Sequence, residues 1–586
     1  MQIAAASTAL PPDHRSRSTD VEERSCPILE ERSVAPVEGP LRGSAAAALV
    51  QIAASLVFIP QAAAIGVAVG AIAAGGDARI ALWPAALVAL LGVAKALLEA
   101  AGSRMAFRSA RAKLSELRSR SVLALSATSP LDSTRPPSGA AASVVAEQAE
   151  AVVPYLARFR SARLRAMIVP PAILACVLAL SWAAALILLL AAPLIPIFMA
   201  LIGWRAKEAS ERQLGAMSSM NGFLLDRLRG IATIRSFGAV DATAERVRAQ
   251  ADSLRRRTMA VLRIALLSTA VLELFAALGV AMVAVYVGFH LLGQIGFGAW
   301  GARLSLGQAL FILLLAPAFF EPLRDLSAAW HDRAAGEAAI EGLERLCANR
   351  ASFHGAEDDT PRAIARHTAP GLRIDGLCYR HADRPLWIFD GLDLAIAPGE
   401  HVALLAPSGM GKSTLLALIG GLARPQAGCI MIGGAVMNDA NAATLRQRMA
   451  WIDQTPHIFA GTLAANVTLG RPQVSRGDVD AALDAMGLAH IRDRPPAMIG
   501  EGGAGLSGGE ALRLALARAA ATPEATLILA DEPTAHLDGD TARQITASLL
   551  ELARGKTLVV ATHDPALAVR MDRVIQLDAA SMEAAA

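Results

Sequence analysis

Six long apolar segments constrain this chain more than any other feature. They cover about residues 45–74, 79–101, 164–182, 184–204, 260–293 and 305–324. An α-helix needs about 20 mostly apolar residues to cross a bilayer. A hydrophobic content of 54% with only 18% charged residues is also too apolar for an ordinary soluble enzyme. The sequence therefore predicts an all-α membrane domain with six transmembrane helices, in preference to a set of buried helices in a soluble protein.

Basic residues indicate how these spans are oriented. They gather in the long connections between the second and third spans and between the fourth and fifth, whereas the opposite connections carry little more than Arg79 and Arg303. Cytoplasmic connections are the ones enriched in Lys and Arg. Both termini and the C-terminal half are therefore expected in the cytoplasm. Charges at helical spacing along the two basic connections predict helices that extend well beyond the membrane.

The predicted domains are a disordered cytoplasmic tail (1–42), a transmembrane domain with long cytoplasmic extensions (43–348), a linker (349–370) and a nucleotide-binding domain (371–580). Acidic residues in the tail argue against a secretory signal. In the last domain, short apolar runs alternate with helical segments, which is typical of an α/β fold with a largely parallel sheet. Five scattered cysteines have no metal-binding spacing and are interpreted as reduced thiols.

A glycine-containing loop, APSGMGKST, lies between the apolar runs 401–405 and 415–419. A strand, such a loop and a helix start together favour phosphate binding, because the loop and the helix end supply backbone N–H groups. Lys412 is expected to reach the β- and γ-phosphates, and Ser413 to bind Mg²⁺. The loop opens with Ala406, where the pattern has Gly; the alternative is a glycine-rich turn without nucleotide. The expected ATP contacts here are Pro407, Ser408, Gly409, Met410, Gly411, Lys412, Ser413 and Thr414.

Other residues predict an ATP hydrolysis site around this loop. Asp531 ends an apolar run and is a candidate Mg²⁺ ligand, and Glu532 is the candidate general base. Gln454 is expected to contact the metal or the attacking water, and His563 the γ-phosphate. Tyr379 is either an aromatic ring that stacks on adenine or an ordinary strand aromatic. His563 is alternatively a capping residue.

A second anion-binding group is predicted at a helix start, in the segment LSGGE. Its expected ATP-contacting residues are Ser507, Gly508, Gly509 and Glu510.

In their order along the chain, these motifs resemble the Walker A loop, Q-loop, signature, Walker B motif, D-loop (535–538) and switch histidine of ABC ATPases. Six spans fused ahead of them resemble the type IV ABC exporter half-transporters. Glu510, where that family usually has Gln, is a second departure after Ala406. The resemblance implies an ATP hydrolase coupled to translocation, with ATP and Mg²⁺ as cofactors and an ATP site formed between two chains. A soluble ABC ATPase would explain only the second half.

Membrane segments narrow the resemblance further. Residues 181–188, 223–230, 283–289 and 315–326 are similar to the CydD-type subunits of thiol-reductant ABC exporters. This resemblance implies a heterodimer with a CydC-like half-transporter in the bacterial inner membrane. It also implies export of cysteine, glutathione or both to the periplasm, in support of cytochrome bd assembly. Haem or another small amphipathic solute is the alternative cargo, and no nucleic acid partner is expected.

Several residues in the membrane half allow two interpretations. Glu273 either meets the ammonium group of a thiol substrate or pairs with Arg263. His290 either ligates haem iron or is an interfacial side chain. Glu321, Arg324 and Asp325 either line a cytoplasmic entrance or form an ordinary salt-bridge cluster. Residues 223–238 are expected to contain a short coupling helix that docks on an ATPase domain near Gln454.

Overall fold

The structure of the chain is a computed structural model. It describes residues 42–75, 77–193, 230–300, 303–348, 351–356, 368–407, 409–492, 499–500, 505–522 and 524–577, with scattered residues between 209 and 228. The predicted N-terminal tail, apart from Arg42, and Ser408 lie outside the described residues.

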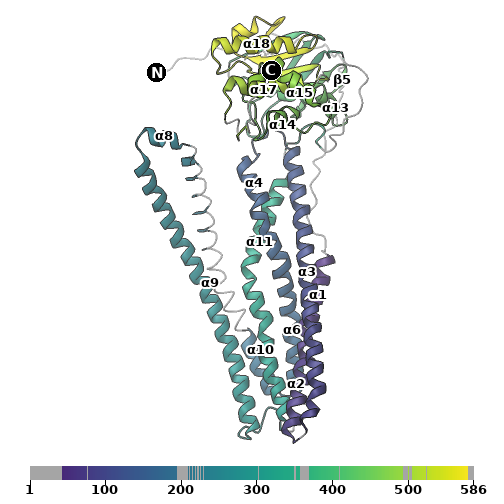
Figure 1. Ribbon diagram of the computed structural model, residues 1–586, viewed down its shortest axis with the longest axis vertical. Coiled ribbons are helices and arrows are strands. Elements are labelled where there is room, and N and C mark those ends of the chain that lie inside the picture. The colour runs from purple at the N-terminus through teal and green to yellow at the C-terminus, as the bar shows by residue number, and fades with distance from the viewer. Residues whose placement is uncertain are drawn as a thin grey trace, which may run out of the picture. The chain divides into compact units, whose positions relative to one another are not determined.

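The N-terminal half is mainly helical in its described residues. Its helices are α1 (Arg42–Leu56), α2 (Phe58–Ala73), η1 (Ala78–Ala81), α3 (Leu82–Ala127), α4 (Ser138–Ala146), η2 (Gln148–Ala151), α5 (Val152–Pro154), η3 (Tyr155–Phe159), α6 (Arg160–Leu178), α8 (Ile231–Ser236), α9 (Val240–Leu291), α10 (Leu306–Ala328) and α11 (Trp330–Cys347). At 1.5 Å per residue, α3 and α9 are each about 70 Å long or more. A bilayer core is about 30 Å thick, so both helices extend far beyond it, as predicted (Figure 1).

Five of the described helical segments are long and apolar enough to span a membrane. A shorter apolar helix, Trp182–Pro193, covers the start of the fourth predicted span, and residues 194–204 lie outside the described residues. The turn between the third and fourth spans falls at residues 179–181, a few positions earlier than predicted. The apolar run continues through this turn, so hydropathy alone does not mark it. The Ser181 hydroxyl fixes it by donating to the Gly298 carbonyl at 2.7 Å.

Close helix packing in this half depends on glycine. A Cβ on Gly66 of α2 would lie 2.7 Å from the carbonyl oxygen of Gly307 on α10, so the two backbones meet directly. Likewise, a Cβ on Gly279 of α9 would lie 2.6 Å from the Phe320 ring of α10. Small residues allow such approach, which is how helices associate within lipid. Helix α10 is therefore packed against both α2 and α9.

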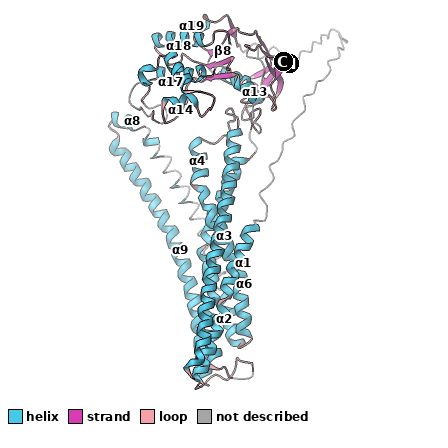
Figure 2. Ribbon diagram, turned by 45° about the vertical axis from the view of Figure 1, so that its right-hand side comes forward, coloured by secondary structure: helices cyan, strands magenta, loops and turns pink. Residues whose placement is uncertain are grey.

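The C-terminal domain contains two sheets, which Figure 2 shows as its magenta strands. One has the order β2-β1-β4-β5 and is antiparallel; the other has the order β6-β7-β8-β3-β9 and is parallel. The strands are β1 (Leu372–Tyr379), β2 (Phe389–Ile396), β3 (His401–Leu405), β4 (Ala427–Ile432), β5 (Ala435–Val436), β6 (Met449–Ile452), β7 (Leu527–Asp531), β8 (Thr557–Thr562) and β9 (Arg573–Gln576). Every residue of β7 and β8 is buried, as expected for parallel strands covered on both faces.

Helices pack on these sheets. They are α12 (Lys412–Ile419), α13 (Ala442–Gln447), α14 (Leu463–Thr468), α15 (Arg476–Ala485), α16 (Ala489–Arg492), α17 (Gly508–Ala520), α18 (Gly539–Leu552) and α19 (Pro565–Ala568). The parallel sheet confirms the predicted α/β class. The separate antiparallel sheet was not distinguished in the sequence, because its strands have the same short apolar pattern.

Candidate functional site

The predicted catalytic residues lie along one edge of the parallel sheet. Strands β6, β7, β8 and β3 are neighbours, with Ile452 opposite Ala530 and Asp531 opposite Ala561. Parallel strands end at a common edge, which is where ligands bind in open α/β sheets. Gln454 follows β6, Glu532 follows β7, and His563 follows β8. The phosphate-loop segment follows β3 at the same edge.

Backbone conformation explains the glycines of the phosphate loop. Gly409 and Gly411 have φ values of +87° and +83°, which favour glycine. A Cβ on Gly411 would also lie 2.5 Å from Ile388 Cγ2, whereas a Cβ on Gly409 would meet nothing within 4 Å. Ala406 has no positive φ, and its buried methyl group belongs to an apolar cluster, so the departure from Gly introduces no strain there.

The other residues of the loop differ in their exposure and lead into helix α12. Pro407 is exposed, and Met410 packs against the same apolar cluster as Ala406. Gly411 precedes helix α12, whose first residues are Lys412, Ser413 and Thr414. The helix start therefore supplies N–H groups beside the loop, as the sequence predicts.

A buried ion pair joins Lys412 to Glu532. The Lys412 Nζ donates to the Ala406 and Pro407 carbonyls at 2.7 and 3.2 Å, and it lies 3.2 Å from Glu532 Oε1. The other Glu532 oxygen is 2.6 Å from His563 Nδ1. Glu532 has φ +46°, an unusual conformation for a residue with a side chain. Its N–H donates to the Ala561 carbonyl at 2.8 Å, which holds this conformation next to β8.

Asp531 and Ser413 fit a divalent cation. Asp531 is buried, and burial raises the pKa of its carboxyl, whereas a hydrogen bond with the Ser413 side chain acts to lower it. Its Oδ1 atom is buried and has no hydrogen-bond partner among the described residues. A buried carboxylate oxygen needs a compensating partner, and Mg²⁺ prefers oxygen ligands. Asp531 and Ser413 would hold the ion, which supplies charge neutralisation at the phosphates. Gln454, two residues after the neighbouring strand β6, is exposed.

The segment LSGGE forms a helix cap. Ser507 N–H and Oγ donate to Glu510 Oε2 at 2.7 and 2.9 Å, and Glu510 N–H donates back to Ser507 Oγ, which makes a capping box at the start of α17. The Ser507 backbone N–H holds the pKa of Glu510 below its usual value. His490 Nε2 lies 3.2 Å from the second Glu510 oxygen. Glu510, at the position where the family usually has Gln, thus preserves the capping box. Gly508 is exposed, and a Cβ on Gly509 would lie 2.9 Å from Thr541 Cγ2.

Tyr379 is the predicted site residue least available to a ligand. It ends β1 with 7% of its surface exposed, inside the apolar cluster of the antiparallel sheet. Its ring meets the His381 ring edge-on, with centroids 5.5 Å apart. Burial raises the pKa of its hydroxyl. These contacts favour the strand-aromatic interpretation, and adenine stacking stays a prediction.

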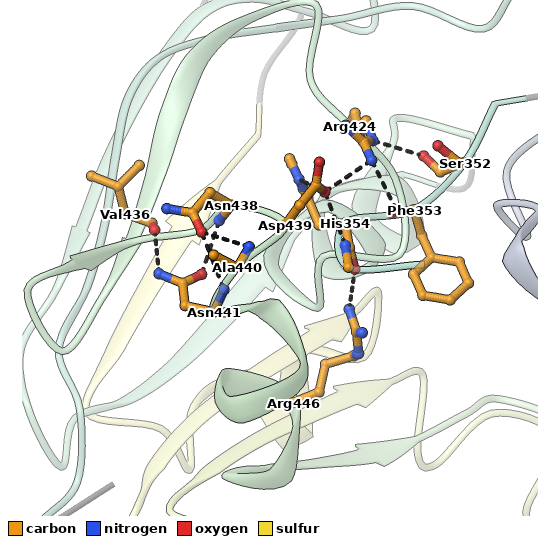
Figure 3. Close-up of polar contacts among 11 residues, drawn as sticks. Ser352, Phe353, His354, Arg424, Val436, Asn438, Asp439, Ala440, Asn441 and Arg446 are labelled. Carbon is orange, nitrogen blue, oxygen red and sulfur yellow. Dashed lines mark hydrogen bonds and ion pairs between the residues drawn. The ribbon is translucent and has the colours of Figure 1, made fainter. Parts of the chain in front are cut away.

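Residues 351–356 form an anchor on the C-terminal domain that the sequence did not reveal (Figure 3). Arg424 Nε donates to the Ser352 carbonyl at 3.2 Å, and Arg446 donates to the His354 carbonyl at 2.6 Å. Asp439 accepts from the Gly355 N–H at 2.9 Å, contacts His354 Nδ1 at 3.2 Å and pairs with Arg424 at 2.8 Å.

Both titratable groups of this anchor have shifted pKa values. Burial lowers the pKa of His354. Burial acts to raise the pKa of Asp439, but the Gly355 N–H and the Arg424 charge outweigh it and hold that pKa below its usual value. No local sequence pattern predicts the anchor, because His354 and Asp439 are 85 positions apart.

Charged residues in the membrane half form cross-helix ion pairs. Glu273 of α9 lies 3.1 Å from Arg324 of α10, which is not the Arg263 partner considered from sequence. Arg165 of α6 lies 2.6 Å from Asp325 of α10. His290 is buried, and its Nε2 accepts from the Leu304 N–H at 3.3 Å, which favours the structural interpretation over metal ligation.

The short helix α8 lies within the segment expected to contain a coupling helix. None of its residues is buried, and the adjoining Phe237 is 83% exposed. Docking of this segment near Gln454 stays a prediction.

Comparison with known proteins identifies both halves. Residues 45–323 match the ABC transporter transmembrane region, and residues 389–535 match the ABC transporter family. The transport ATP-binding protein AarD of Providencia stuartii is 36% identical, over 82% of this chain and 82% of that protein. The glutathione/L-cysteine transport system ATP-binding/permease protein CydD of Haemophilus influenzae is 34% identical, over 80% of this chain and 79% of the relative.

A solved structure shares the fold. A bacterial Atm1-family ABC exporter with ATP bound superposes with a TM-score of 0.71 at 22% identity, over 92% of this chain and 93% of that one. Together with the relatives above, these matches show that the chain belongs to the ABC transporter family, as an ATP-hydrolysing type IV exporter half-transporter with CydD proteins among its homologues.

Proposed function

We propose that this half-transporter exports cysteine, glutathione or both from the cytoplasm to the periplasm, across the bacterial inner membrane. The observation that carries the proposal is the similarity to CydD proteins named for glutathione and L-cysteine transport, at 34% and 35% identity over most of the chain. That similarity covers far more than the ATPase motifs, which all ABC proteins share. Support of cytochrome bd assembly is the cellular role that this transport would serve.

A second half-transporter is required in this proposal. The Ser507–Glu510 segment caps α17, and in this proposal it contacts the ATP bound to a second chain. A CydC-like subunit is the proposed partner, and a CydC protein of Bacillus subtilis is itself 32% identical to this chain. Each nucleotide would then lie between the Walker A loop of one chain and the signature of the other. Closure on ATP and release after hydrolysis would bias the helices between two arrangements.

The residues at the sheet edge have separate roles in this cycle. Lys412 binds the β- and γ-phosphates, and Glu532 accepts a proton from the attacking water. His563 would contact the γ-phosphate, and its contact with Glu532 orients that carboxylate. Asp531 with Ser413 and Gln454 would hold Mg²⁺. Tyr379, Pro407, Ser408, Gly409, Met410, Gly411, Thr414, Ser507, Gly508, Gly509 and Glu510 are the proposed further ATP contacts.

Transport into inverted membrane vesicles tests the proposal. Vesicles with the chain and its partner should accumulate labelled cysteine or glutathione when ATP is added. Matched vesicles with Glu532→Gln, which keeps the shape of the side chain, should accumulate neither. ATP-dependent haem uptake without thiol uptake would contradict the thiol proposal and support the haem alternative. Thiol uptake that persists in the Glu532→Gln vesicles would contradict its coupling to this ATPase.

A further inference from the structure

Four charged side chains on three membrane helices lie at a similar depth. Arg165 lies 13 residues before the end of α6, Glu273 lies 18 residues before the end of α9, and Arg324 lies 18 residues after the start of α10. At 1.5 Å per residue, these positions are about 20 to 27 Å from the helix ends. Asp325 follows Arg324 directly. These helix ends lie together, since residues 181 and 299 of the two connecting loops pair with each other.

The two ion pairs of this group leave charge accessible. The Glu273 side chain is 52% exposed and the Arg324 side chain 36% exposed, although both belong to apolar segments. A charged group is costly against lipid, so such a group faces a cavity or another protein surface. The Nε atoms of Arg165 and Arg324 are buried and have no hydrogen-bond partner among the described residues. The accessible charge of the group is therefore the Glu273 carboxylate and the exposed part of the Arg324 guanidinium.

A zwitterion is the ligand class that matches this arrangement. An exposed ion pair contributes only about 0 to 1 kcal/mol, so opening the Glu273–Arg324 pair costs little. A ligand with an ammonium and a carboxylate group would replace that one pair with two. A purely anionic or cationic solute would pair with one side chain and leave the other without a partner.

We propose that Glu273 and Arg324 form a binding site for amino-acid-like zwitterions, in which Glu273 binds the ligand ammonium and Arg324 its carboxylate. The Arg165–Asp325 pair holds the neighbouring turn of α10 in place. This inference rests on the proposed function, because cysteine and glutathione both have an ammonium and a carboxylate group. It adds the residues that recognise these groups, which the relatives' names do not state.

Ligand analogues test the two contacts separately. Inverted vesicles with the chain and its partner are given cysteine, 3-mercaptopropionate, which lacks the ammonium, or cysteamine, which lacks the carboxylate. Each charge-assisted contact should favour cysteine by at least about tenfold over the analogue that lacks it. Glu273→Gln should lower the cysteine to mercaptopropionate ratio by at least about tenfold and keep the cysteine to cysteamine ratio. Arg324→Gln should do the reverse.

A matched control is available on another helix. Glu99 of α3 pairs with Lys95 and lies 17 residues after the start of its helix, at about the same depth. Glu99→Gln should leave both uptake ratios unchanged. Each ratio is internal to one variant, so differences in expression cancel. Glu273→Asp and Arg324→Lys keep the charges and should keep both preferences, which covers a Gln variant that fails to assemble.

The outcomes separate the two proposals. Wild-type vesicles that accumulate neither cysteine nor glutathione would contradict the proposed function. Wild-type thiol uptake with ratios that are unchanged in Glu273→Gln and Arg324→Gln would overturn only the zwitterion site. Equal changes in Glu99→Gln would also overturn it, since the effect would then belong to any charge at that depth.

Discussion

Glu532→Gln should tighten ATP binding as well as stop hydrolysis. An ammonium group has three donors, and the Ala406 carbonyl, the Pro407 carbonyl and the Glu532 carboxylate accept from Lys412. A phosphate oxygen must displace one of them to reach Lys412. A hydrogen bond to a charged partner contributes about 1.5–3 kcal/mol and a neutral one about 0.5–1.5 kcal/mol. Replacing the carboxylate with an amide therefore weakens the competing contact by about 1 kcal/mol, which corresponds to about fivefold tighter binding.

The assay must separate binding from turnover. ATP affinity of the purified protein should be measured by titration in EDTA, where the absence of Mg²⁺ prevents hydrolysis in both proteins. Asp540→Asn is a suitable control, because it makes the same change of charge at an exposed position outside the sheet edge. Equal ATP affinities of wild type and Glu532→Gln would refute the competition argument. Hydrolysis at the wild-type rate by Glu532→Gln in Mg²⁺ would refute the role of Glu532 as general base.

Three further predictions concern stability. Gly409→Ala should cost about 1–2 kcal/mol from its positive φ, and Gly411→Ala about 1–3 kcal/mol more from its clash; equal thermal shifts of the purified protein would contradict this. Folding lowers the pKa of His354 and of Asp439 and so disfavours their protonation, which means that stability decreases as the pH falls through each folded-state pKa. The protection of the amides of residues 351–356 against exchange, taken relative to the unfolded chain at the same pH, should therefore fall on acidification from pH 7, and it should fall less in Asp439→Asn. Glu510→Ala should destabilise α17 by about 0.5–2 kcal/mol in chemical unfolding, whereas Glu510→Gln should preserve the capping box.

Local chemistry explains which features could be predicted from the sequence. Gly409 and Gly411 could be assigned to a phosphate loop because a positive φ favours glycine at both positions, and the close approach of Ile388 also excludes a side chain at Gly411. Asp531 and Glu532 were predicted because a buried strand ends at them, and the sheet order then places them beside Lys412. The membrane spans could be predicted from hydropathy. Backbone N–H and C=O groups in lipid must be hydrogen-bonded within the protein, and a helix does this within one apolar segment.

Contacts between segments that are distant in the sequence could not be predicted. Glu273 pairs with Arg324 because α9 and α10 pack together, and no periodicity in either helix indicates that register. The His354–Asp439 contact likewise joins segments that are distant in the sequence. Tyr379 has the strand position expected of an adenine-stacking ring, yet its burial depends on neighbours from other strands.

In a pair with a half-transporter that has Gln at the matching position, the capping box of α17 would make the two nucleotide sites unequal. Glu510 places a resident negative charge where the helix dipole is positive. The electrostatic attraction of that helix N-terminus for a second anion is therefore reduced. A partner with Gln at the matching position would retain the full attraction. Closure over the partner's ATP should then be weaker than closure over the ATP bound to this chain, so that one nucleotide exchanges faster than the other.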